Sequence, residues 1–172
     1  KDLMKKYGKA GDTEQYNFFN KRQHVQKILL NSLYGVLGLP AFRFYDLDNA
    51  VAVTTTGQTV IKSTADMTNI KYNKELNTPG VDQNIYIDTD SVFFSAAPLM
   101  NVRYPDWKNE TDDTIAGYVN VIATEVQDYL NSFYDVLAKK IFNITEHRLE
   151  IKKEYVAKAG LWVAKKRYAQ WI

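Results

Sequence analysis

Asp88 and Asp90 are the residues of this sequence best suited to chemistry, because they form an acidic corner between two apolar runs. The segment from Ile85 to Phe94 reads I-Y-I-D-T-D-S-V-F-F. Alternation along a strand predicts that both carboxylates point to one side. Carboxylates so placed suit Mg²⁺, which prefers oxygen ligands, retains waters and accepts substrate phosphates as further ligands. An ordinary surface turn, rich in Asp and Thr, explains the same residues without a metal.

A second group of polar residues, Lys27, Asn31 and Tyr34, recurs at helical spacing. At about 100° per residue they share one side of a helix, and the opposite side carries an apolar stripe. That stripe consists of Val25, Leu29, Leu33 and Val36. A lysine can neutralise triphosphate oxygens, an amide can hydrogen-bond polar groups, and a tyrosine can pack against a sugar or base edge. A solvated helix face with an extended lysine is the structural alternative.

A basic element near the end of the sequence consists of Lys165, Lys166, Arg167 and Tyr168. In a strand, alternate residues face opposite ways, so one pair can address a nucleic-acid backbone while its neighbours brace the site. A basic tetrapeptide by itself is more typical of solvated surface.

Composition narrows the classes of protein. The 172 residues, 45% of them hydrophobic, are enough for one domain or one piece of a larger domain. The absence of cysteine excludes thiolate zinc sites, disulfides and cysteine nucleophiles. No stretch approaches the roughly 20 apolar residues of a membrane helix, so we expect a soluble protein that does not bind a membrane. We expect it in the cytoplasm, which would be the host cytoplasm if the chain is viral. Acidic residues dominate 82–135 between basic ends, which fits a cation site flanked by polyanion-binding surface or simply a solvated surface.

The elements that must position these residues are of both types. Apolar periodicity predicts three helices, from about Glu14 to Leu37, Thr55 to Leu76 and Thr114 to Ile141. Alternation predicts strands at Ile85–Ile87, Val92–Ser95, Leu149–Ile151 and Leu161–Ala164. The first dozen residues read as a mobile end or a cut through a longer element, residues 41–53 as an irregular connection, and Pro98 and Pro105 as part of a loop. The predicted class is α+β with an antiparallel sheet.

Taken together, the motifs resemble those of family B DNA polymerases. Y-x-D-T-D-S between apolar strands resembles motif C, and K-I-L-L-N-S-L-Y-G, from Lys27 to Gly35, resembles motif B. Lys165 to Tyr168 resembles the K-K-R-Y element that holds the primer strand. Residues 42–46 and 54–58 resemble the T-even bacteriophage branch, where this region lies near the template. The motifs follow the order of the family, and the resemblance spans about residues 21–172.

The resemblance implies a fragment of a polymerase alpha-like, T-even phage-like enzyme. Residues 1–38 would be the C-terminal part of the fingers, with a long helix, and residues 39–172 a partial palm with an antiparallel sheet and packed helices, so the polymerase core is incomplete. It implies catalytic roles for Asp88 and Asp90, with Asp90 the direct ligand of a two-Mg²⁺ site and Asp88 beside it. The implied dNTP-binding residues are Lys27, Asn31 and Tyr34, and the implied DNA-binding residues are Thr54, Gly57, Lys165, Lys166, Arg167 and Tyr168, with Lys166 at the primer terminus.

Two departures from the family pattern bear on activity. Ile87 stands where motif C usually has Gly, and nothing resembles motif A, D-x-x-S-x-Y-P, which supplies another metal-binding Asp. The resemblance therefore implies nucleotidyl transfer from a dNTP to the 3′ hydroxyl of primer–template DNA, by an assembly whose exonuclease, motif A palm and thumb lie elsewhere in cis or in trans. We expect the fragment alone to be inactive. The alternatives are a noncatalytic DNA-binding or assembly piece of a split or degenerate polymerase, and a metal-dependent nuclease.

Overall fold

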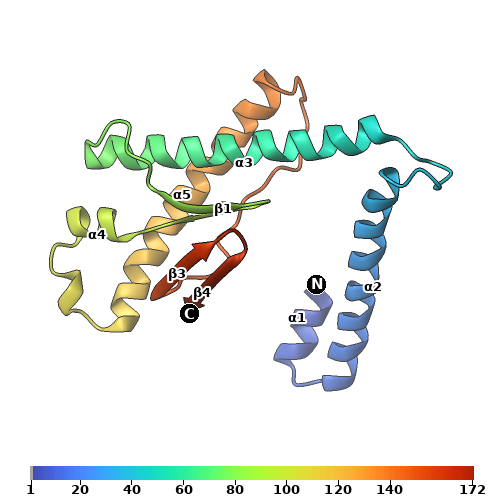
Figure 1. Cartoon of the computed structure of the whole chain (residues 1–172). Helices are drawn as coiled ribbons and strands as arrows, with labels where there is room; N and C mark the ends of the chain where they lie inside the picture. Colours follow the sequence, from blue (N-terminus) through green and yellow to red (C-terminus); the bar gives the residue numbers. More distant parts are fainter. Residues whose placement is uncertain (1) are drawn as a thin grey trace. The chain divides into compact units, whose positions relative to one another are not determined.

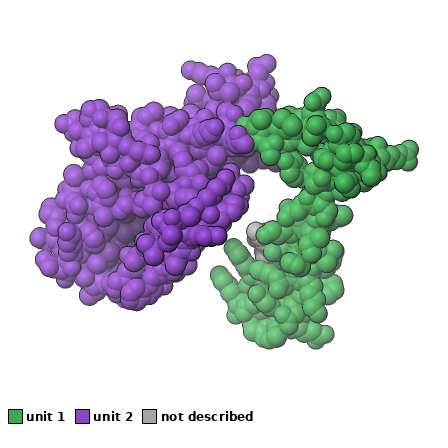
Figure 2. Space-filling view, in the orientation of Figure 1, with its two compact units in different colours: residues 1–56 green, residues 57–172 purple. Residues whose placement is uncertain are grey.

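The fold, taken from a computed structural model that describes residues 2–172, is a mixture of helices and small antiparallel sheets (Figure 1). The described residues form five α-helices, one short 3₁₀ helix and two two-stranded sheets. The α+β class with antiparallel strands is therefore confirmed. The chain divides into two compact units, residues 1–56 and residues 57–172, coloured green and purple in Figure 2. Among the described helices, none combines the length and apolar character needed to cross a bilayer.

The first unit begins with a helical hairpin. Helix α1 (Asp2–Lys9) precedes α2 (Thr13–Leu37), and the Asp12 side chain caps α2 by accepting a hydrogen bond from the Gln15 N–H at 3.0 Å. The rings of Tyr7 and Phe19 stack with centroids 5.5 Å apart. The first dozen residues were read as a mobile end or a cut through a longer element. The structure has a helix at Asp2–Lys9, which contact with α2 stabilises and which is too short to be recognised from periodicity.

Helix α2 confirms the predicted helix at nearly the same bounds, and Gly38 ends it as expected. Its apolar stripe, however, does not pack: Val25, Leu29 and Leu33 are 63%, 67% and 58% exposed. Helix α1 is only eight residues long and runs beside the first turns of α2 (Figure 1). The prediction that one side of α2 is buried therefore fails within the described part of the chain.

Helix α3 (Leu47–Leu76) starts eight residues before the predicted Thr55. The missed signal is Asp46, whose carboxylate accepts hydrogen bonds from the backbone N–H and side-chain amide of Asn49 at 3.0 and 2.6 Å. The aromatic residues Phe42, Phe44 and Tyr45 beside Arg43 and Asp46 favoured an irregular connection over 41–53 in the sequence. In the helix, the Thr54 hydroxyl donates to backbone carbonyls one turn back, including that of Ala50 at 2.9 Å, so the helix satisfies it internally.

The core of the second unit lies where α3, α4 (Ala97–Arg103) and α5 (Asp112–Lys140) meet. Its fully buried members are Tyr72, Leu99, Met100, Ile122, Val126 and Leu130. Most of them are residues that helical periodicity placed inward. Helix α4 replaces the predicted loop, with Pro98 in its first turn, where the missing N–H has no intrahelical partner to lose. The 3₁₀ helix η1 (Trp107–Asn109) follows.

Arg103 ties these three helices together. Its guanidinium contacts the carboxylates of Glu75 in α3 and Glu125 in α5, with Nη2–Oε2 distances of 2.8 and 2.7 Å. The hydrogen bonds to Arg103 hold the pKa of Glu75 below its usual range. Burial raises the pKa of the nearby Tyr72 hydroxyl. No local sequence pattern indicates this network, because its members are far apart along the chain.

Two hairpins complete the second unit. One pairs β1 (Asn84–Asp88) with β2 (Ser91–Phe94), and the other pairs β3 (Ala159–Ala164) with β4 (Arg167–Trp171). The predicted strands at 85–87, 92–95 and 161–164 are confirmed. The one predicted at 149–151 is wrong, because its Ile151 N–H and C=O bond to the Asn131 side chain at 2.9 and 3.1 Å instead of a strand.

Candidate active site

The acidic corner is the two-residue turn of the β1–β2 hairpin. Asp88 is the last residue of β1 and pairs with Ser91, so Thr89 and Asp90 form the turn itself. Thr89 has φ +49°, a left-handed conformation that a β-branched residue adopts only under constraint. Strand alternation therefore cannot be extended from Asp88 to Asp90, and the prediction that it places both carboxylates on one side does not hold.

The two carboxylates have different surroundings. Asp88 is largely buried, with its side chain 18% exposed, and its Oδ1 lies 3.0 Å from the Thr89 hydroxyl and 3.6 Å from Nζ of Lys166. Asp90 is exposed. Within residues 2–172 its carboxylate has no hydrogen-bond or ion-pair partner. Asp90 is thus the freer of the two to bind a cation, and Asp88 is the better fixed.

An aromatic cluster joins the two hairpins of the second unit. Tyr86 and Phe93 come from the β1–β2 hairpin, and Trp162 and Tyr168 come from the β3–β4 hairpin. The Tyr168 ring centroid lies 5.7 Å from that of Tyr86 and 5.6 Å from that of Phe93, while the rings of Phe93 and Trp162 are 5.9 Å apart. Aromatic contacts at such distances are attractive as well as apolar. The cluster brings residues about 80 positions apart to one place.

The basic element lies at the turn of the β3–β4 hairpin, beside the acidic turn. Lys165 and Lys166 form the turn and Arg167 begins β4, so the prediction that all of them belong to one alternating strand was wrong. Lys166 has φ +62°, and its backbone N–H donates to the Tyr86 hydroxyl at 2.7 Å. Both lysines and the arginine are exposed. Tyr86 belongs to the Y-x-D-T-D-S motif, but its contact with Lys166 was not predicted, because spacing gives no sign of so distant a partner.

The predicted nucleotide-binding residues lie in the first unit. Lys27, Asn31 and Tyr34 are all exposed, and the unbroken helix α2 keeps them on one face, as their spacing predicted. The Tyr34 hydroxyl donates to the backbone carbonyl of Ala50, in the first turns of α3, at 3.4 Å. This contact is long, so Tyr34 is only lightly restrained. The face is available to a ligand.

The two predicted template-side residues, Thr54 and Gly57, both lie within α3. The helical position of Gly57 agrees with the helix predicted from about Thr55 to Leu76. Gly57 has open space where a side chain would be, so the backbone is accessible at this point. It leaves a gap in the helix surface without altering the path of the chain.

Comparison with known proteins places this geometry in a family. The family model described as DNA polymerase family B matches residues 1–103, which include α2 and the β1–β2 hairpin. The chain belongs to DNA polymerase family B. It is 33% identical over 158 residues to the DNA-directed DNA polymerase of Enterobacteria phage T4 and 30% identical over 169 residues to that of Escherichia phage RB69. It is also 30% identical over 170 residues to the DNA polymerase alpha catalytic subunit of Mus musculus.

These matches cover most of the family B chain and little of each relative. They include 87%, 93% and 98% of this chain but only 18%, 18% and 9% of the T4, RB69 and mouse proteins. The chain therefore spans less than a fifth of the length of these polymerases. The family is established over the region that holds both candidate turns.

The family B chain supplies part of the donor set that a divalent cation requires. Asp88 and Asp90 offer carboxylate oxygens, the ligand type that Mg²⁺ prefers, and Mg²⁺ is commonly held by one or two carboxylates plus waters and substrate phosphates. Among residues 2–172, no group of three or more His, Cys, Asp or Glu side chains is arranged to hold a metal. The two carboxylates of the acidic turn thus fit the role of some, but not all, of the ligands of a metal ion.

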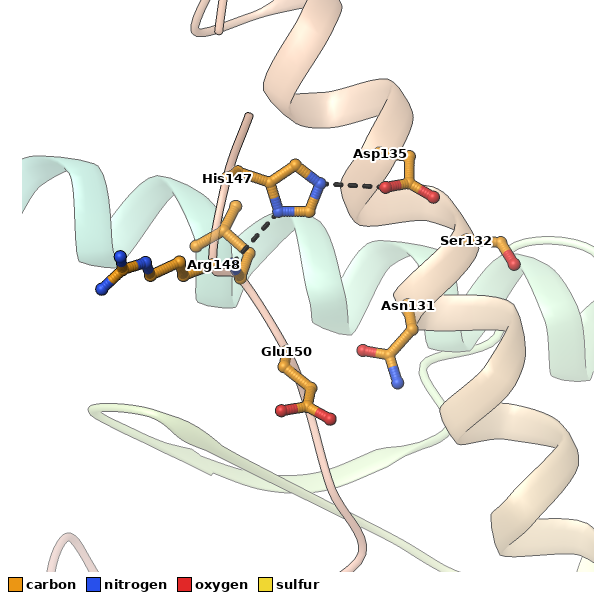
Figure 3. Close-up of a pocket in the computed structure, with 7 residues that line it drawn as sticks. Asn131, Ser132, Asp135, His147, Arg148 and Glu150 are labelled. Atoms are coloured by element: carbon orange, nitrogen blue, oxygen red, sulfur yellow. Dashed lines mark hydrogen bonds and ion pairs between the residues drawn. The ribbon is translucent and has the colours of Figure 1, made fainter. Parts of the chain in front are cut away.

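A polar hollow lies elsewhere on the family B chain (Figure 3). In it, the His147 ring lies between α5 and its own strand-like segment. Its Nε2 is 3.0 Å from Oδ1 of Asp135, and its Nδ1 accepts the N–H of Leu149 at 3.1 Å. Both ring nitrogens have partners, so His147 anchors the chain after α5 to that helix.

Proposed function

We propose that this chain takes part in template-directed DNA synthesis, the transfer of a nucleotide from a dNTP to a primer 3′ hydroxyl. Residues 1–38 would belong to the fingers and residues 39–172 to the palm. The observation that carries the proposal is the meeting of the acidic and basic turns, where Nζ of Lys166 and Oδ1 of Asp88 are 3.6 Å apart. At a primer terminus, a carboxylate such as Asp88 would help to bind the cation, and a lysine such as Lys166 would bind the adjacent phosphate.

Each turn would have its own task. Asp90, exposed and unpaired, would be the direct ligand of Mg²⁺, and Asp88 would be the neighbouring carboxylate. When bound, Mg²⁺ would supply electrostatic stabilisation of the attacking and leaving oxygens. Lys166 would contact the primer near its 3′ end, while Lys165 and Arg167 would bind backbone phosphates without reading sequence.

The exposed face of α2 would bind the incoming nucleotide. Lys27 would neutralise triphosphate oxygens, since an ammonium group forms charge-assisted hydrogen bonds with phosphate. Asn31 and Tyr34 would line the pocket of the nascent base pair. Thr54 and Gly57, one turn apart on α3, would lie along the template strand.

The chain would work with other polymerase segments. Its two carboxylates supply part of a metal site, so a further carboxylate, together with exonuclease and thumb regions, would come from elsewhere in cis or in trans. Primer–template DNA and dNTPs would be the substrates. We expect the isolated chain to bind these substrates without catalysing primer extension.

The test is Asp90→Asn in the complete polymerase. We expect primer extension to fall by at least about 100-fold, because a metal ligand is lost, while the dissociation constant for primer–template stays within about twofold, because Asp90 contacts no phosphate. Asp113→Asn, which removes an exposed carboxylate at the start of α5, is the matched control and should leave both unchanged.

Labelled primer also separates the alternatives. Shortened primer in the presence of Mg²⁺ and absence of dNTPs, lost in Asp90→Asn, would favour a nuclease site at this turn. Extension that survives Asp90→Asn would contradict the proposal and leave a noncatalytic DNA-binding role.

A further inference from the structure

Lys166 lies in the two-residue turn of the β3–β4 hairpin, a kind of turn that commonly takes a positive φ, and it also has a support from outside its own hairpin. At φ +62° it occupies the left-handed region, which favours glycine over residues with a side chain. Such a conformation persists only where surrounding contacts determine it. Its N–H has one such contact, the Tyr86 hydroxyl at 2.7 Å, and that tyrosine belongs to the other hairpin. The turn is therefore held from outside its own hairpin.

Tyr86 and Asp88 reach the same lysine because of strand geometry. Residues two apart in a strand point to the same face, and both belong to β1. Tyr86 accepts the Lys166 N–H, and Asp88 lies 3.6 Å from the Lys166 ammonium. The intervening Ile87 lies on the other face and is 40% exposed. One face of β1 thus contacts both the backbone and the side chain of Lys166.

The Tyr86 ring is itself restrained, which makes its hydroxyl a fixed acceptor. Its centroid is 6.0 Å from that of Phe93 on the neighbouring strand and 5.7 Å from that of Tyr168 on the other hairpin. A side chain held on both sides loses little further freedom when it accepts a hydrogen bond. The hydroxyl therefore fixes the direction of the contact between the two hairpins, which ring packing alone would not fix.

We infer that Tyr86 is a positioning residue, whose hydroxyl sets the place of the Lys166 turn relative to the acidic turn and so the grip on the primer terminus. The inference rests on the proposed function of Lys166. It assigns to Tyr86 a role through Lys166, without contact to the reacting atoms.

The experiment compares two tyrosine-to-phenylalanine variants in the complete polymerase. Tyr86→Phe keeps the ring and removes the acceptor of the Lys166 N–H. Tyr155→Phe is matched to it, because the Tyr155 hydroxyl also bonds to the β3–β4 hairpin, donating to Oε1 of Gln170 at 2.6 Å, away from the two turns. Both proteins lose one hydroxyl, so thermal unfolding should report similar small losses for the two.

We expect Tyr86→Phe to raise the dissociation constant and the KM for primer–template by roughly fivefold, the effect of one lost hydrogen bond. The kcat at saturating DNA should stay within about twofold, and Tyr155→Phe should leave all three near wild type. Primer–template affinities equal to wild type in Tyr86→Phe, or equally weakened in both variants, would overturn the inference. Because affinity is read by fluorescence anisotropy, a polymerase that binds in this way without extending primers would refute the proposed function and still support the role of Tyr86.

Discussion

Nζ of Lys166 and Oδ1 of Asp88 lie 3.6 Å apart, although the two residues are separated by 78 positions in the sequence. The lysine is mostly exposed, with its side chain 65% accessible, while that of the aspartate is 18% accessible. An opposite charge at this distance partly neutralises the carboxylate. The carboxylate that would lie beside a divalent cation therefore has a positively charged neighbour in Lys166.

Replacement of this lysine should tighten cation binding. In Lys166→Met, Asp88 loses its ammonium partner, and we expect the affinity of the complete polymerase for Mn²⁺ to rise by about threefold, in line with an exposed ion pair. Electron paramagnetic resonance of free Mn²⁺ measures the change. Lys165→Met is the matched control, because this substitution removes the same charge from the same turn, while Lys165 forms no ion pair with Asp88. Equal effects of the two variants would show that only the general field of the turn matters.

Acid should remove a stabilising contact of the second unit. The hydrogen bonds from Arg103 lower the pKa of Glu75, so the native state favours the ionised carboxylate more than the unfolded chain does. The resulting stability is present above the unfolded pKa and is lost as the pH falls through the lower, folded pKa. We expect Glu75→Gln to cost about 1 kcal/mol in urea unfolding at pH 7, a partly exposed pair being worth no more.

The pH dependence distinguishes this contact from simple packing. The difference between wild type and Glu75→Gln should close as the pH is lowered below the usual carboxylate range. Glu110→Gln, at an exposed acidic residue after η1, should show no difference at either pH. A Glu75→Gln deficit that persists unchanged in acid would contradict the role assigned to the Arg103 ion pair.

Local signals in the sequence determined much of the fold. Apolar periodicity and Gly38 defined α2, and two apolar runs around Asp88 and Asp90 defined the β1–β2 hairpin. Each of these signals is contained within a few neighbouring residues. The start of α3 was missed because the aromatic residues before Asp46 suggested an irregular connection and hid its capping role, and α1 was missed because it depends on packing against α2.

The candidate site was predictable only in its parts. The acidic and basic elements could each be recognised from residue types, but their meeting depends on aromatic contacts between hairpins, such as that of Tyr86 with Tyr168. No pattern of period 2 or 3.6 reports a contact across so many residues. The same holds for the left-handed φ of Lys166, which places a turn where a continuous strand through residues 165–168 was predicted.

The β3–β4 hairpin should be sensitive to the smallest change at Gly160. A Cβ added there would overlap the ring of Trp162, which is held by Phe93 from the other hairpin at a centroid distance of 5.9 Å. The ring cannot move without disturbing that contact, so we expect Gly160→Ala to lower the free energy of unfolding by about 1–3 kcal/mol, the cost of overpacking. Gly117→Ala provides the opposite control, because Gly117 lies in α5 with open space around it, and alanine should add up to about 1 kcal/mol of helix stability. Thermal unfolding of both variants measures the contrast. If Gly160→Ala is as stable as wild type, the aromatic cluster is not the rigid joint between the hairpins, and the position of the basic turn must depend on the contacts of Lys166 with Tyr86 and Asp88.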